Sequence, residues 1–217
     1  MCVKWRKPLS KLGMKDNSIS FRWWGHSCFQ VTYQDYSIVF DPYQMGSVPG
    51  YPPLHLIANE VHCSHDHADH NGVSQVQIQP GTNPWQMQYI DTFHDHHQGA
   101  HRGKNIVTVL SADGYRIAHL GDLGCISTIN ALNDCDVWMI PVGGYYTISA
   151  LEAKAMIDMY QPKVVLPMHA RFGQKGYAEI APINDFLKEC SHVKVVDSVY
   201  TYTKDSPSET ILFDKSV

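Results

Sequence analysis

The sequence predicts a single α/β domain in which helices cover a β-sheet, and three observations support that prediction. Short runs rich in β-branched and aromatic residues alternate with turn signals through the first half of the chain. In the second half, strand patterns at 137–142 and 163–168 enclose a helical pattern between 149 and 162, which indicates a crossover unit. The 217 residues suffice for one domain that buries about 70% of its unfolded surface.

Composition excludes several classes of protein. A hydrophobic content of 44% with 18% charged residues describes a soluble globular domain, and no apolar run approaches the ~18 residues of a membrane span. The net charge of −4 argues against a nucleic-acid-binding surface, which usually carries a basic excess. Six scattered cysteines without a Cys-x-x-Cys pair are typical of buried thiols in a reducing cytosol, so we expect a cytoplasmic protein.

The N-terminus carries five basic residues among its first 15 positions, but no apolar segment follows them. This pattern is not that of a secretory signal, because such a signal needs a hydrophobic stretch behind its basic one. We therefore expect residues 1–17 to form a flexible extension and residues 18–217 to form the single domain.

The folded part begins with a pattern of two strands joined by a turn. A strand pattern from 21 to 31 leads through a turn at 34–35 to a second strand pattern at 37–42, which predicts a hairpin. We place His26 and Asp41 at strand ends, where they could orient metal ligands through hydrogen bonds without binding the metal themselves. For His26 the alternative is a buried histidine bonded to the backbone. A Gly/Pro-rich loop at 44–53 follows and could shape access to a site.

The stretch 61–72, Val-His-Cys-Ser-His-Asp-His-Ala-Asp-His-Asn-Gly, directly follows an apolar run. His65 and His67 are two residues apart, so in an extended segment their side chains leave the same side of the backbone. Asp69 and His70 precede an Asn-Gly turn signal, which can bring them back over the same space. Imidazole and carboxylate suit zinc and related divalent ions, so the stretch predicts a site for two ions side by side. The alternative is a polar, His-rich loop without metal.

This stretch resembles the His-x-His-x-Asp-His signature of the metallo-β-lactamase superfamily, whose members hydrolyse their substrates with a dinuclear metal centre. The diiron flavoprotein branch of that superfamily carries glutamate at the second histidine position, where this chain has His67. The resemblance therefore implies hydrolysis rather than reduction of oxygen or nitric oxide.

A second motif follows the strand pattern at 88–93. The run 94–105 contains four histidines, and the residues alone do not choose among them. One branch of the superfamily has His-Asp, a short spacer, Gly, and then Arg-Gly-x-Asn, with the first histidine as a metal ligand. That pattern maps onto His94, Asp95, Gly99, Arg102, Gly103 and Asn105. The other three histidines then fall in a solvated spacer.

Two further strand ends resemble the same branch. Asp113-Gly114 predicts a hairpin whose second strand ends in Gly-Asp-Leu-Gly, and the resemblance makes Asp122 there the bridging metal ligand. A helix should begin at the capping box Ser149-x-x-Glu152 and end before position 162. Its predicted apolar face consists of Leu151, Ala155, Met156 and Met159. The strand after it ends in Pro-Met-His, and the resemblance makes His169 the last ligand.

The resemblance runs from residue 25 to residue 169 and implies a four-layer αββα sandwich, with two facing sheets and the metal site at one edge. The branch is that of small metal-dependent hydrolases such as L-ascorbate-6-phosphate lactonase and N-acylphosphatidylethanolamine phospholipase D. It implies one ion on His65, His67 and His94, a second on Asp69, His70 and His169, and Asp122 between them. The implied nucleophile is a hydroxide between the ions, which Asp69 orients before it passes the proton to the leaving group.

We therefore expect a metal-dependent hydrolase of a small ester, lactone or phosphodiester, with two divalent ions that are zinc or manganese before iron or nickel. A metal-binding protein without turnover and a redox diiron protein are the alternatives, and His67 disfavours the second. The expected partner is a small-molecule substrate, which could be phosphorylated. A nucleic-acid substrate is not expected, because the chain is too short for the inserted domain of the superfamily's nucleases. Membership of a homo-oligomer stays open.

Three side chains could rim such a site. Arg171 follows His169 by two residues, and Tyr145 and Tyr146 follow a Gly-Gly turn after the preceding strand. If both strand ends open on the same edge, a guanidinium there suits a phosphate or carboxylate beside the scissile bond. The alternative for Arg171 is a surface residue paired with an acid.

Overall fold

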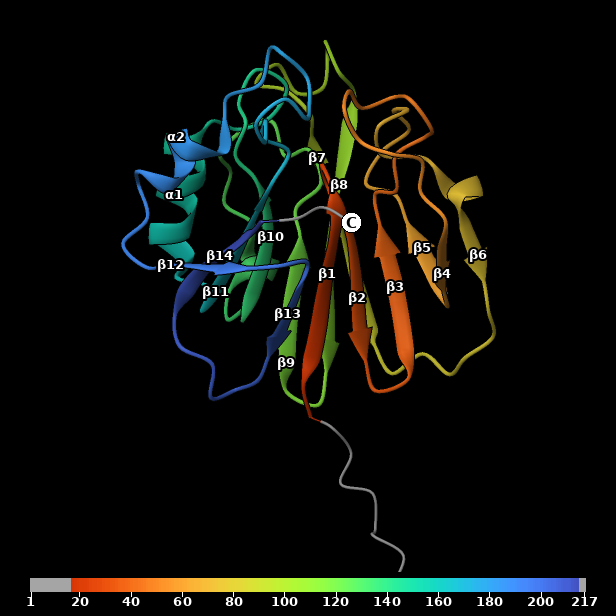
Figure 1. The fold of residues 1–217 in the computed structure, drawn as a ribbon. Coiled ribbons are helices and arrows are strands. Elements are labelled where there is room, and N and C mark those ends of the chain that lie inside the picture. Colours follow the sequence, from red (N-terminus) through yellow and green to blue (C-terminus); the bar gives the residue numbers. More distant parts are fainter. Residues whose placement is uncertain (1–16, 215–217) are drawn as a thin grey trace, which may run out of the picture.

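Two mixed β-sheets face each other in this computed structural model, which describes residues 17–214 (Figure 1). The predicted N-terminal extension therefore lies outside the described residues, apart from its last residue. The first sheet has the order β13-β1-β2-β3-β5, with β1 Ile19–Gly25, β2 Cys28–Tyr33, β3 Tyr36–Phe40, β5 Glu60–His62 and β13 Val199–Tyr202. The second has the order β12-β14-β11-β10-β9-β8-β7, with β7 Gln86–Phe93, β8 Lys104–Ala112, β9 Tyr115–His119, β10 Val137–Pro141, β11 Val164–Met168, β12 Val193–Val196 and β14 Glu209–Phe213.

Strand direction brings many chain ends to the same edge. In the first sheet β5 runs parallel to β3. In the second sheet β9, β10 and β11 are parallel, and β7 has their direction because two antiparallel pairings separate it from β9. The loops that follow these strands gather at one end of the sandwich, at the top of Figure 1.

Side chains alternate between two cores along the second sheet. On β10, Val137 and Met139 pack against the first sheet, whereas Trp138 and Ile140 belong to the cluster under the helices. Successive strand residues point to opposite faces, and both faces of this strand are covered. Burial on both faces explains why the predicted strand at 137–142 contains no polar residue.

The two described α-helices, α1 Ala150–Tyr160 and α2 Ile183–Leu187, pack on the outer face of the second sheet. The capping box is confirmed, because the Glu152 N–H donates to Ser149 Oγ and the Ser149 N–H donates to the Glu152 carboxylate. The predicted apolar face is wrong except for Met156, which is buried together with Ala153. The other three predicted residues, Leu151, Ala155 and Met159, are exposed.

Two further sequence predictions need correction. The first predicted strand is two strands, because the chain reverses at Gly25 and His26, whose φ angles are +115° and +51°. The polar segment 75–89, whose Pro-Gly and Asn-Pro steps favour an irregular connection, instead contains β6 Val76–Ile78 and the start of β7. β6 pairs with β4 Leu56–Ala58 beside the first sheet, and two 3₁₀ turns lie at Val73–Gln75 and Asn130–Leu132. Within 17–214, no helix is long and apolar enough to cross a membrane.

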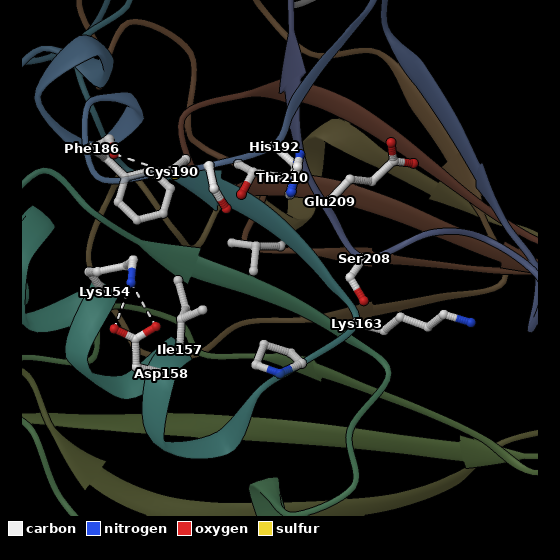
Figure 2. A pocket seen from close by; sticks show the side chains of 13 residues that line it. Lys154, Ile157, Asp158, Lys163, Phe186, Cys190, His192, Ser208, Glu209 and Thr210 are labelled. Carbon is white, nitrogen blue, oxygen red and sulfur yellow. Dashed lines mark hydrogen bonds and ion pairs between the residues drawn. The ribbon is translucent and has the colours of Figure 1, made fainter.

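A hollow of about 190 Å³ lies beside α1, α2 and the edges of β11 and β14 (Figure 2). The ammonium group of Lys154 is already paired there with Asp158 at 2.6 Å. The residues lining this hollow include no member of a described group of metal-ligating side chains. It therefore offers no obvious reactive centre.

Candidate metal centre

All seven side chains proposed as metal ligands meet where the two sheets end together. The segment after β5 supplies His65, His67, Asp69 and His70. One residue each follows β7, β9 and β11, namely His94, Asp122 and His169. Three groups of possible metal ligands can be drawn from these residues and His26. Within each group, the potential ligand atoms lie within 4.8 Å of one another.

The first group consists of three imidazoles, His65, His67 and His94. Their ring centroids lie 4.5 Å apart for His65 and His67, and 4.7 Å apart for His65 and His94. Burial, and then the neighbouring His70, lowers the pKa of His65 to about 3. Its ring is therefore neutral at neutral pH and can offer a nitrogen lone pair to a metal ion.

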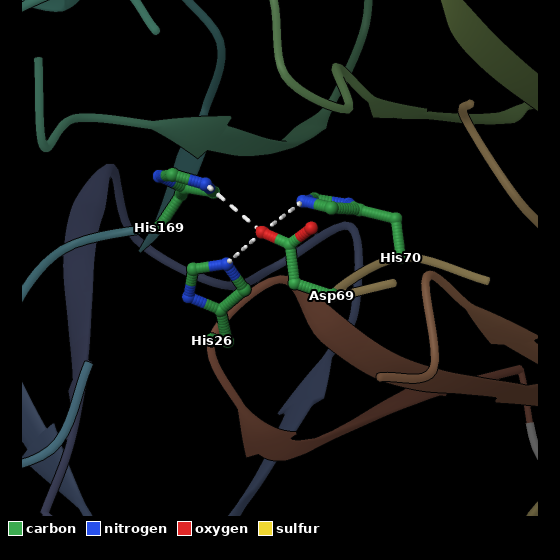
Figure 3. Close-up of side chains that lie close together, drawn as sticks. All are labelled: His26, Asp69, His70 and His169. Carbon is green, nitrogen blue, oxygen red and sulfur yellow. Dashed lines mark hydrogen bonds and ion pairs between the residues drawn. The ribbon is translucent and has the colours of Figure 1, made fainter. Parts of the chain in front are cut away.

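The second group surrounds the Asp69 carboxylate (Figure 3). Asp69 Oδ2 lies 3.2 Å from Nε2 of His26, 3.5 Å from Nε2 of His70 and 4.0 Å from Nε2 of His169. Three of these residues are the predicted set for the second ion. His26 is the addition, and its ring faces the site while its backbone carbonyl accepts the indole N–H of Trp23.

Asp122 lies between the two groups. Its Oδ2 is 3.1 Å from Nε2 of each of His70, His94 and His169, and 3.9 Å from Nε2 of His65. Burial opposes ionisation of this carboxyl, but His169 and His70 hold its pKa well below its usual range. A buried carboxylate that contacts imidazoles of both groups has the position of a bridging ligand.

The donor atoms fit a bound cation. His65 Nε2 and Asp122 Oδ1 are buried and have no hydrogen-bond partner among the described residues. Buried polar atoms are rarely left unsatisfied, and a divalent ion is one partner that would satisfy both of these. Imidazole and carboxylate suit zinc or manganese. No cysteine belongs to the three groups, and burial raises the pKa of the nearby Cys63 thiol to about 12.

A layer of hydrogen bonds orients these side chains. The Asp41 carboxylate accepts from the Ser64 N–H at 2.6 Å, from Ser64 Oγ at 2.7 Å and from His70 Nδ1 at 2.7 Å. His94 Nδ1 donates to the Tyr146 carbonyl at 3.0 Å. Such bonds fix which ring nitrogen is free to face a metal.

Backbone geometry at the site is unusual. His26, Asp41 and His169 have φ angles of +51°, +44° and +50°, in the left-handed region that residues with a Cβ rarely adopt. Such conformations persist where the surrounding structure enforces them, and they cluster at functional sites. At Gly121, with φ +56°, any Cβ would collide with Asn105 and Ser64, so the turn that presents Asp122 requires glycine.

The loop after His94 is organised by Asp95. Its carboxylate accepts the backbone N–H groups of residues 97, 99, 101 and 102 at 2.7 to 3.0 Å. Burial alone would raise the pKa of Asp95, but these four hydrogen bonds lower the pKa to about 2. The bond from the Arg102 N–H has the largest effect of the four. The loop in turn places Arg102 with its guanidinium 5.3 Å from the ring centroid of Tyr146 and 5.9 Å from that of Tyr145.

A cavity of about 350 Å³ opens over the metal-ligand groups, lined by His67, Asp69, His94, His101, Arg102, Asp122, Tyr146, His169 and Tyr177. Arg171 does not line it, and its Nε points to the Ile180 carbonyl at 3.5 Å. Tyr145 is mostly exposed beside the cavity. Tyr177 was missed by sequence analysis, although its Gly-Tyr step in a loop shortly after His169 was an available signal.

Comparison with known proteins identifies the family. A family model described as "Beta-lactamase superfamily domain" matches residues 20–169, more than half of the chain. The chain belongs to the metallo-β-lactamase superfamily. The predicted fold class is thereby confirmed.

Relatives of this superfamily member are named as metal-dependent hydrolases. One from Opitutus terrae, named a UPF0173 metal-dependent hydrolase, is 24% identical over 187 residues, which cover 68% of this chain and 82% of the relative. Another of that name from Symbiobacterium thermophilum is 26% identical and covers 70% and 84% of the two chains. These comparisons place the chain in the class of metal-dependent hydrolases.

Solved structures agree with this placement. A candidate zinc-dependent hydrolase of the superfamily from Thermotoga maritima superposes with a TM-score of 0.69 at 29% identity, covering 90% of this chain and 98% of the other. Igni18, a metallo hydrolase from Ignicoccus hospitalis, superposes with a TM-score of 0.63 at 18% identity and covers 86% and 99%. The second likeness concerns the fold alone.

Proposed function

We propose that this chain hydrolyses a small ester, lactone or phosphodiester with two divalent ions bound at the seven clustered side chains. The observation that carries the proposal is the position of Asp122, whose Oδ2 lies 3.1 Å from an imidazole nitrogen of His94 in one group and of His70 and His169 in the other. A shared carboxylate at that place suits a pair of ions rather than a single one.

The ligand assignment follows the two groups. His65, His67 and His94 would hold one ion, Asp69, His70 and His169 the other, and Asp122 would bridge them. When bound, the ions supply Lewis acidity, which lowers the pKa of water and polarises the substrate oxygen. Zinc or manganese suits these nitrogen and oxygen donors, and the likeness to a candidate zinc-dependent hydrolase favours zinc.

Asp69 is the group best placed to move a proton. Its carboxylate lines the cavity and is held by His26 Nε2 at 3.2 Å. It can accept a proton from the attacking water and then deliver that proton to the leaving-group oxygen. His26 keeps the carboxylate pointed in one direction, which lowers the cost of reaching the reactive geometry.

The cavity limits the size of the substrate. A volume of about 350 Å³ lies near the lower end of the range for small-molecule pockets, roughly 300–1,000 Å³. Tyr146 and Tyr177 line the wall over His169, and their ring centroids lie 5.8 Å apart. These aromatic side chains would keep bulk water away from one side of the bound substrate.

The test is a panel of lactones, aryl esters and phosphodiesters assayed with metal-loaded protein. We expect turnover that a chelator abolishes and that zinc or manganese restores. Asp69→Asn should lower kcat by about 100-fold or more, as expected for loss of a general base. A wild-type protein that carries two ions but turns over nothing in the panel would favour a metal-binding protein without catalysis.

A redox diiron centre is the weaker alternative, because His67 occupies the position where the diiron branch has glutamate. Bound iron that absorbs visible light and that mild donors reduce would favour the diiron alternative.

A cytoplasmic location also belongs to the proposal. Its support is that all five cysteines in the described part of the chain are free.

A further inference from the structure

One cation in the wall of the cavity has no acidic partner. Arg102 is the only arginine or lysine among the nine residues that line the cavity. The residue is partly buried, and within residues 17–214 its guanidinium forms no ion pair with a carboxylate. Its charged end lies instead against the faces of two tyrosine rings.

The backbone that carries Arg102 is firmly placed. The Arg102 N–H donates to Asp95 Oδ2 at 2.8 Å, and the next residue, Gly103, donates its N–H to the Gly99 carbonyl at 2.9 Å. The Gly103 carbonyl accepts the backbone N–H of His94 at 3.1 Å, so the loop closes directly onto a proposed metal ligand. The backbone at Arg102 is thus held before any ligand arrives, which reduces the entropy cost of binding.

The acid closest to Arg102 along this loop does not neutralise it. Both oxygens of Asp95 accept backbone N–H groups, two each, and its hydrogen bonds on this loop are all to the backbone. The guanidinium therefore keeps its donors for another acceptor. Its planar fork matches a phosphate or carboxylate with two parallel hydrogen bonds.

We propose that Arg102 binds an anionic group of the substrate, a phosphate or a carboxylate, that stands beside the scissile bond. The inference rests on the proposed hydrolase function, since it assigns the substrate class of the same site. Tyr146 forms the aromatic face behind the guanidinium, and Tyr177 lies next to Tyr146 along the wall. Arg171, the residue that the sequence suggested for this role, lies outside the cavity lining.

Bound metal ions would attract an anion on their own, so a preference for charged substrates is not sufficient evidence. The experiment compares three esters that share one leaving group skeleton: phenyl acetate, 4-carboxyphenyl acetate and 4-phosphonophenyl acetate. The carboxylate and phosphonate arms distinguish the two kinds of anion. Arg102→Met keeps the aliphatic stem and removes the charge, and Arg171→Met is the matched control. Metal content is measured in every variant.

We expect Arg102→Met to lower kcat/KM for at least one charged ester by about 10- to 100-fold more than for phenyl acetate. Arg102→Lys should restore part of the difference, and Arg171→Met should change all three esters alike. Equal losses on all three esters in Arg102→Met would overturn the inference.

A binding measurement separates this inference from the proposed function. Calorimetry with phenylphosphonate and with benzoate on the metal-loaded protein requires no turnover. Should wild-type protein hydrolyse none of these three esters, the calorimetry decides about Arg102 alone. The proposed function fails only if the panel of lactones, aryl esters and phosphodiesters is not turned over either. Binding weakened about tenfold or more in Arg102→Met supports the anion site, and unchanged binding of both probes refutes it.

Discussion

The role that we propose for Asp122 is metal binding rather than stabilisation of the core. Its carboxylate contacts imidazoles, while the two apolar clusters of the sandwich form without it. We expect Asp122→Ala to lower affinity for both ions by at least about 100-fold, since even indirect partners of metal ligands contribute 10- to 100-fold. Equilibrium dialysis with zinc measures the loss.

Circular dichroism of the same variant reports whether the fold survives, which we expect because a core of this size does not need metal to form. Asp158→Ala is the control, as that carboxylate pairs with Lys154 on the surface of α1 and belongs to no metal-ligand group of the described residues. Global unfolding of Asp122→Ala in excess metal would show that the residue is needed for folding.

His26 makes the metal-free protein sensitive to acid. Burial, and then His169, lowers its pKa from 6.5 to about 4. As the pH falls below 6.5 the unfolded chain takes up this proton first, so the stability associated with the neutral ring is present above pH 6.5 and is lost toward pH 4. Gln at this position cannot take up a proton but can still donate to Asp69.

We therefore expect wild-type protein to lose up to about 3 kcal/mol more than His26→Gln between pH 7 and pH 4. Urea unfolding of both metal-free proteins at several pH values measures the difference. Parallel pH profiles would mean that His26 does not titrate in this way.

At the level of elements, the contribution of the α1 capping box to stability can be measured separately from metal binding. Ser149 and Glu152 satisfy each other's backbone N–H groups at the start of the helix. Ser149→Ala should reduce the free energy of unfolding by about 1 kcal/mol, the usual cost of losing such a cap. Metal content should not change.

Lys154→Ala is a suitable comparison on the same helix, because its exposed pair with Asp158 should contribute no more than about 0.5 kcal/mol. Thermal or urea unfolding of the two variants ranks them. A Ser149→Ala protein as stable as wild type would refute the assigned role of the cap.

The same helix shows where sequence patterns stop being informative. Residues 153, 156, 157 and 160 form a second apolar stripe, whose steps of three and one residues are as typical of a helix as those of the predicted stripe. Only packing on the second sheet decides which stripe is buried, and it buries Ala153 and Met156. A similar limit applies to β1 and β2, because the apolar pattern continues across a turn that His26 makes in an uncommon backbone conformation.

The metal-ligand groups were more predictable than the cavity wall. His65, His67, Asp69 and His70 lie close in sequence, so local geometry already brings them together. The remaining ligands were assigned by resemblance of strand-end motifs, and the structure brings them to the same place. The partners of Arg102 and the position of Tyr177 depend on how separate loops pack, which spacing along the chain does not encode.

At the scale of the whole molecule, the two sheets meet at the proposed centre. The first sheet leads into His65, His67, Asp69 and His70, whereas His94, Asp122 and His169 follow strands of the second. Each proposed ion has ligands from both sheets, so binding should stabilise their association. Metal present at 100 times its dissociation constant would add about 2.7 kcal/mol for each site.

The number of ions per chain tests this account most directly. Native mass spectrometry of mildly purified protein, repeated after reloading with zinc or manganese, counts ions on the intact chain. We predict two divalent ions per chain, both lost on chelation and both recovered on reloading. At most one ion per chain, even after reloading, would contradict the dinuclear centre.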